Sequence, residues 1–164
     1  MANTLVAYFS AYGTTKRFAE EIHKIIGGDI LEIEPETPYD KDTAHYDALA
    51  EYAKKERDND TRPKIKNDVD ISKYDTVFLG YPMWWYTFPQ IIRSFLDKYD
   101  FSGKTIIPFN THEGSGDGGT YKEMQEYVPN AKVVSNGLPI QGEKLKTDNQ
   151  HETIAKWIDS LGLK

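Results

Sequence analysis

Residues 8–15 read Tyr-Phe-Ser-Ala-Tyr-Gly-Thr-Thr and lie between an apolar run and an amphipathic segment. Such a strand, loop and helix can hold a phosphate, because the free N–H groups of the first helical turn and the helix dipole favour an anion. The loop matches neither GxxxxGK[ST] nor GxGxxG. Its hydroxyls, Ser10, Thr14 and Thr15 around Gly13, suit one terminal phosphate monoester. The alternative is that Ser10 and Thr14 only cap the helix.

A second candidate binding segment, residues 80–89, is rich in aromatic side chains. Trp84, Trp85, Tyr86 and Phe88 lie between Pro82 and Pro89. One such ring would most simply pack in the core, but four in one loop favour a flat apolar ligand that stacks on them.

A third candidate segment, residues 110–119, has four glycines in its last six positions. Glycines let backbone groups approach a ligand closely. No serine-nucleophile motif accompanies His112, so we interpret it as a loop histidine near the ligand rim. A metal site using His112 with Glu113 or Asp117 matches no familiar ligand spacing, and we predict no metal.

The elements that must position these segments alternate along the chain. Apolar runs predict strands, and residues spaced by three and four predict helices. The expected strands are Leu5–Phe9, Ile30–Glu34, Thr76–Tyr81, Thr105–Phe109 and Lys132–Ser135. The expected helices are Thr15–Ile26, Tyr46–Arg57, Pro89–Lys98, Tyr121–Tyr127 and Asn149–Leu161.

This alternation predicts a parallel sheet covered by helices on both faces, a three-layer α/β/α sandwich of class α/β. The partly alternating second strand suits an edge of the sheet. Ligands in such folds lie at the carboxyl ends of the strands, where the strand order reverses. The three candidate loops follow the first, third and fourth strands and would meet there.

Composition narrows the class of protein further. The 164 residues suit a single domain spanning 1–164, and the absence of cysteine excludes disulfides, thiolate metal sites and a cysteine nucleophile. The net charge of −6 argues against nucleic-acid binding and favours small ligands or basic protein partners. Neither a secretory signal nor a long apolar run is visible, so we expect a cytoplasmic protein that does not insert into membranes.

At this point the whole chain resembles the flavodoxin family, in particular members with Tyr-Pro-Ile-Trp-Trp and Thr-Ser-Gly-Gly-Ser-Gly signatures. The matching segments are Gly80-Tyr81-Pro82-Met83-Trp84-Trp85, Phe101 to Phe109, and Gly114-Ser115-Gly116. The resemblance implies a five-stranded parallel sheet in the order 2-1-3-4-5, with flavin mononucleotide (FMN) at the point where that order reverses.

The resemblance also assigns cofactor-binding residues. The phosphate would be held by Ser10, Tyr12, Gly13, Thr14 and Thr15. The ribityl chain and one side of the ring would be covered by Pro82, Met83, Trp84, Trp85 and Tyr86. The other edge of the ring would be lined by Thr111, His112, Gly114, Ser115 and Gly116, with the carboxylates of Glu113 and Asp117 nearby. No catalytic residue is implied.

Four residues depart from the family pattern. Tyr12 stands where Thr or Ser is usual, and Thr14 where Asn is common. Glu113 and Asp117 stand where neutral residues are usual. Carboxylates near the ring would oppose the extra negative charge of a reduced flavin, which predicts a low reduction potential.

The expected function is that of an FMN-binding, low-potential electron-transfer protein that works between basic redox partners as a monomer or weak dimer. One alternative is an NAD(P)H-dependent FMN or quinone reductase that uses the same pocket. A second alternative is a flavodoxin-like binding module without bound flavin.

Overall fold

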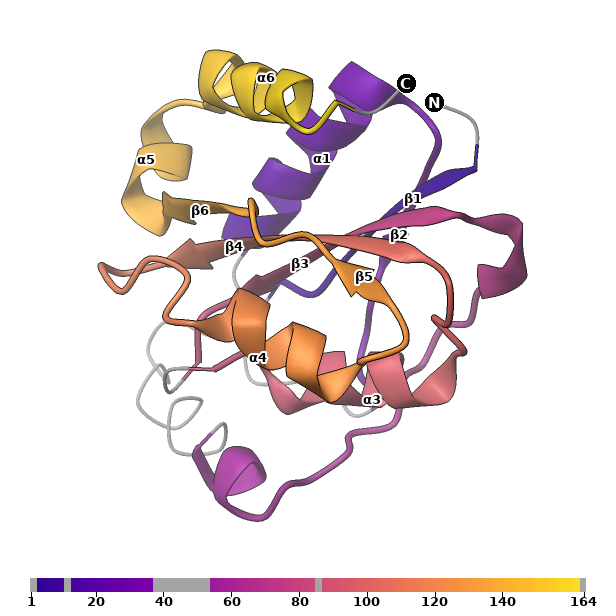
Figure 1. The fold of residues 1–164 in the computed structure, drawn as a ribbon. Coiled ribbons are helices and arrows are strands. Elements are labelled where there is room, and N and C mark those ends of the chain that lie inside the picture. The colour runs from indigo at the N-terminus through magenta and orange to yellow at the C-terminus, as the bar shows by residue number, and fades with distance from the viewer. Residues whose placement is uncertain (1–2, 11–12, 37–53, 85–86, 163–164) are drawn as a thin grey trace.

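The computed structural model describes residues 3–10, 13–36, 54–84 and 87–162. In these residues the strands form one parallel sheet, and helices cover it (Figure 1). The strands are β1 (Thr4–Tyr8), β2 (Asp29–Glu32), β3 (Thr76–Pro82), β4 (Thr105–His112), β5 (Lys132–Val133) and β6 (Leu138–Gln141). The helices are α1 (Thr14–Ile26), α3 (Gln90–Lys98), α4 (Thr120–Tyr127), α5 (Gly142–Thr147) and α6 (His151–Ser160), and a 3-10 turn, η2, covers Ile71–Lys73.

The strand order is β2-β1-β3-β4-β5, and each neighbouring pair is parallel. This confirms the expected order, with β2 at one edge. A sixth strand, β6, was not predicted, and it pairs with the second half of β4 while β5 pairs with the first half. Pro139 lies within β6. Proline is tolerated there because an edge strand leaves one row of N–H groups without ladder partners.

Alternate residues of the central strands enter two separate cores, as the two-residue period of a strand requires. Leu5, Ala7 and Phe9 belong to the core beneath α3 and α4, whereas Val6 and Tyr8 belong to the core shared with α1 and α6. Figure 1 shows the same layers, with α1, α5 and α6 on one face of the sheet and α3 and α4 on the other. The three-layer sandwich is therefore confirmed.

The predicted helices agree with the structure except at two places. Of the helix expected at 46–57, positions 46–53 lie outside the described residues, and the chain is helical at 54–58. The short helix α5 was not predicted, because its six residues are too few to show a helical period.

Gly80, in the middle of the sheet, is needed because of its neighbour on β4. A Cβ atom at Gly80 would lie 2.2 Å from two ring atoms of the fully buried Phe109. We expect Gly80→Ala to lower the free energy of unfolding by about 1–3 kcal/mol, measured by urea denaturation, because the buried ring must shift. In a Phe109→Leu background the same substitution should cost less, and an equal loss in both backgrounds would contradict this explanation.

Candidate functional site

The three candidate loops meet at the carboxyl edge of the sheet, beside the point between β1 and β3 where the strand order reverses. A pocket of about 80 Å³ lies there, smaller than the roughly 300–1,000 Å³ of most small-molecule sites. The enclosed space therefore suits one small group at the end of a larger ligand. It is lined by Ser10, Thr14, Thr15, Pro82, Met83, Trp84, Thr111, His112, Glu113 and Gly142.

Ser10 joins the end of β1 to the beginning of α1. Its Oγ accepts the N–H groups of Gly13, at 3.0 Å, and Lys16, at 3.1 Å. Gly13 precedes the helix with φ +89°, a conformation that glycine adopts without strain. The capping alternative is thus correct for Ser10, whose oxygen accepts helix N–H groups. Its O–H hydrogen has no acceptor among the described residues and could donate to a ligand.

The first turn of α1 presents further donors. The N–H groups of Thr14 and Thr15 donate to no atom of the described residues, and no acidic side chain lies in this turn. Both residues line the pocket. This end of the pocket is therefore suited to an anion with several oxygen atoms.

The hydroxyl of Thr15 is turned toward β4, where its Oγ1 lies 2.8 Å from Oγ1 of Thr111. Both residues are buried. One of the two hydroxyls donates to the other, so this contact uses only one of the pair's two hydrogens. This contact links the beginning of α1 to the end of β4.

The aromatic loop has two different roles. Phe88 is fully buried in the core beneath α3, so the simple core interpretation is correct for this ring, which was not among the predicted cofactor-binding residues. Trp84 is only partly buried, lines the pocket and meets Phe9 edge-on at 5.3 Å between ring centroids. Trp84 and Met83 therefore supply the apolar wall of the pocket.

The glycine loop is anchored from below by buried side chains. The amide of Asn110 donates to the carbonyl of Gly116 at 3.0 Å and its Oδ1 accepts the hydroxyl of Tyr121 at 2.5 Å. Thr120 donates to the carbonyl of Asp117 at 2.6 Å, so Tyr81, 2.8 Å away, donates to Thr120.

Burial raises the pKa of both Tyr81 and Tyr121, which keeps these phenols protonated and able to donate. The loop also packs against the aromatic loop, since a Cβ atom at Gly118 would lie 2.5 Å from Cε of Met83. The two loops therefore support one another beside the pocket.

His112 presents a defined hydrogen-bond donor. Its Nδ1 accepts the N–H of Gly114 at 2.9 Å, so the neutral ring carries its hydrogen on Nε2. Burial lowers the pKa of His112, and the neighbouring Glu113 opposes that shift only in part. The neutral imidazole is thus the favoured form at neutral pH.

Most of the predicted site residues come together, but not all of them line the pocket. The predicted residues that do not line it are Gly13, Gly114, Ser115, Gly116 and Asp117. Tyr12, Trp85 and Tyr86 lie outside the described residues.

Gly142 lines the pocket and was missed by the sequence analysis. An added Cβ there would lie 3.5 Å from Cγ2 of Thr14 and 3.6 Å from a carboxylate oxygen of Glu113. The only sequence signal was a glycine after residues 138–141, which became informative once β6 was seen to bring it to this edge.

Among the described residues, no three His, Cys, Asp or Glu side chains are grouped so that they could hold a metal ion. Over the same part of the chain, none of the helices has the length and apolar character to cross a bilayer.

A parallel sheet in this order, with a pocket at its reversal point, defines a flavodoxin-like α/β protein. A family model described as Flavodoxin matches residues 3–161, and the chain belongs to this family. No curated protein matches the sequence.

Solved structures agree with this assignment. A presumed flavoprotein from Bacteroides eggerthii DSM 20697 is 33% identical over 100% of both chains, with a TM-score of 0.85. Another from Bacteroides uniformis ATCC 8492 is 32% identical over 96% of this chain and 98% of that chain, with a TM-score of 0.83. A flavoprotein from Lactobacillus acidophilus NCFM, solved in complex with FMN, is 22% identical over 90% of this chain and 98% of that one, with a TM-score of 0.70. At that identity the likeness shows the fold alone.

The environment of His112 predicts a pH dependence of stability. Since its pKa is lower in the folded state than the ordinary value of about 6.5, the unfolded chain binds more protons between the two values. The contribution of His112 is therefore complete above about pH 6.5 and is lost as the pH falls through the folded-state pKa. Urea denaturation from pH 7.5 to 5 should show a smaller loss of stability for His112→Gln than for the wild type. Parallel curves for the two proteins would show that His112 has no such effect.

Proposed function

We propose that this protein binds FMN, with the phosphate at the beginning of α1, and acts as a low-potential electron-transfer protein between redox partners. The observation that carries the proposal is the joining of two unlike surfaces in one pocket. The donor groups of Ser10, Thr14 and Thr15 lie at one end, and the side chains of Met83 and Trp84 form an apolar wall. A phosphate ester attached to a flat ring system needs both.

Family membership supports this choice of ligand, as does the FMN complex of the Lactobacillus acidophilus protein. When bound, FMN supplies the redox chemistry, and the protein supplies binding, orientation and electrostatics. Ser10 and the first turn of α1 would hold the phosphate, and Trp84 would shield the ring from water. The Nε2–H of His112 and the backbone of the glycine loop would donate hydrogen bonds to the ring edge.

The charges of the site favour a carrier over a reductase. No lysine or arginine is among the residues that line the described pocket, so a second phosphate-bearing cofactor such as NAD(P)H finds no cation there. The net charge of −6 suits basic redox partners.

Titration of the flavin-free protein with FMN and with riboflavin tests the proposal, because riboflavin lacks the phosphate. The wild type should bind FMN more tightly than riboflavin. Ser10→Ala should weaken FMN binding about tenfold, since one charge-assisted hydrogen bond is lost, and leave riboflavin binding unchanged. Because the riboflavin arm detects damage to the helix cap, it separates a lost phosphate contact from a disturbed fold.

A wild-type protein that binds neither flavin would refute the proposal, and equal affinity for FMN and riboflavin would refute the phosphate site. Rapid NADPH oxidation with a quinone and no partner protein would identify a reductase instead.

Glu113 and Asp117 offer a matched pair for testing the electrostatic part of the proposal. Glu113 lines the pocket and Asp117 does not, although both belong to the glycine loop. In the flavin-bound protein, Glu113→Gln should raise the reduction potential by at most on the order of 100 mV, because solvent screens a surface carboxylate. Asp117→Asn should raise it less. Potentials measured by equilibration with redox dyes decide the matter, and an unchanged value for Glu113→Gln would remove this carboxylate from the explanation.

A further inference from the structure

In the aromatic loop the backbones of Trp84 and Thr87 pair with each other in antiparallel fashion, and this pair is called the aromatic turn below. The N–H of Trp84 donates to the carbonyl of Thr87 at 3.0 Å, and the N–H of Thr87 donates back to Trp84 at 3.2 Å. Just before the turn, the N–H of Met83 donates to the carbonyl of Thr111 at 2.9 Å. The residue before the turn, Met83, is therefore held by β4, and the last residue of the turn is Thr87.

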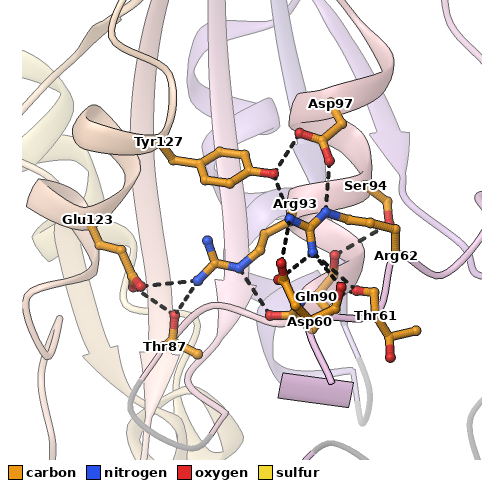
Figure 2. A network of polar contacts seen from close by, with 10 residues as sticks. All are labelled: Asp60, Thr61, Arg62, Thr87, Gln90, Arg93, Ser94, Asp97, Glu123 and Tyr127. Carbon is orange, nitrogen blue, oxygen red and sulfur yellow. Dashed lines mark hydrogen bonds and ion pairs between the residues drawn. The ribbon is translucent and has the colours of Figure 1, made fainter. Parts of the chain in front are cut away.

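The side chain of Thr87 is bonded to two helices. Its Oγ1 donates to Oε1 of Glu123 on α4 at 2.7 Å and accepts from Nη2 of Arg93 on α3 at 3.2 Å. The same Nη2 of Arg93 lies 3.1 Å from Oε2 of Glu123. Figure 2 shows this cluster of Thr87, Arg93 and Glu123, in which each member contacts the other two.

Arg93 is itself held in place. Its side chain is 13% exposed, and its guanidinium carbon lies 4.4 Å from the ring centroid of Phe88 and 5.1 Å from that of Tyr127. Its Nε donates to the side chain of Gln90 at 3.0 Å. A planar cation fixed by ring contacts and several hydrogen bonds offers a rigid support for the turn.

The cluster joins the exits of two loops that approach the pocket. Thr87 ends the aromatic turn shortly before α3 begins at Gln90, and α4, which carries Glu123, begins directly after the glycine loop. We propose that Thr87, Arg93 and Glu123 are positioning residues that hold the aromatic turn, and with it Trp84, at a set distance from the glycine loop. The effect on ligand binding rests on the proposed function, whereas the effect on the turn does not.

A second set of contacts extends from this cluster toward the surface and, among the described residues, involves neither Trp84 nor Thr87. The hydroxyl of Tyr127 donates to Asp97 at 2.6 Å and accepts from Arg62 at 3.1 Å (Figure 2). Tyr127→Phe thus removes one hydroxyl from the same network and keeps the ring next to Arg93. It is a matched control for Thr87→Val, which removes one hydroxyl and keeps the branched shape.

Amide hydrogen exchange in the flavin-free protein tests the cluster directly. In Thr87→Val, the Trp84 N–H should exchange about tenfold faster than in the wild type, because the turn loses its attachment to α3 and α4. Thr87→Ser, which keeps the hydroxyl, and Tyr127→Phe should both exchange at nearly the wild-type rate. Urea denaturation of each variant gives its change in global stability, which is subtracted from the change in the free energy of exchange at Trp84. An unchanged rate in Thr87→Val, or an equal acceleration in Tyr127→Phe, would overturn the proposal.

FMN titration of the same variants tests the consequence for binding. Thr87→Val should bind FMN about tenfold more weakly and show a shifted reduction potential, whereas Thr87→Ser and Tyr127→Phe should match the wild type. Equal FMN affinity in Thr87→Val and the wild type would overturn the positioning role, even if the turn exchanges faster. A wild-type protein without FMN affinity would refute the proposed function, and the exchange rates would still decide whether the cluster holds the turn.

Discussion

The parallel pairing of β1 with β3, and of β3 with β4, is the constraint on which the site depends. Tyr8 lies beside Gly80, and Gly80 lies beside Phe109, so these three strands end at the same edge of the sheet. All three are buried on both faces, and shifting any one of them by a residue would move apolar side chains to the wrong core. The packing of these strands therefore brings the loops after them to one place.

Buried polar side chains then determine the shape of those loops. The side chains of Asn110 and Thr120 hold the glycine loop in place, because they donate hydrogen bonds to the carbonyls of Gly116 and Asp117 from within the fold. Thr87 plays the corresponding part for the aromatic turn. Each of these bonds replaces one to water and is costly to leave unmade in the interior, which favours a single arrangement of the loop backbone.

Sequence patterns were informative where burial is two-sided and less so elsewhere. The apolar runs of β1, β3 and β4 predicted the central strands, and the three loops after them included nine of the ten pocket residues. The run from Leu138 to Gln141 was not recognised, because a four-residue edge strand with a proline resembles a loop. Gly142 was missed for that reason. Phe88 illustrates the opposite difficulty, since a ring in a ligand loop and a ring in the core look alike in sequence.

By itself, the sequence determined the class of fold, the family resemblance and the loops that carry the site, because these follow from hydrophobic period and short motifs. Only the tertiary structure decided what individual side chains do. It showed that Ser10 uses its oxygen to receive helix N–H groups and that Thr15 faces Thr111, 96 positions away along the chain. It also showed that the aromatic turn is tied to Arg93 and Glu123. Such pairings are absent from local patterns because they depend on how helices from distant parts of the chain pack against one sheet.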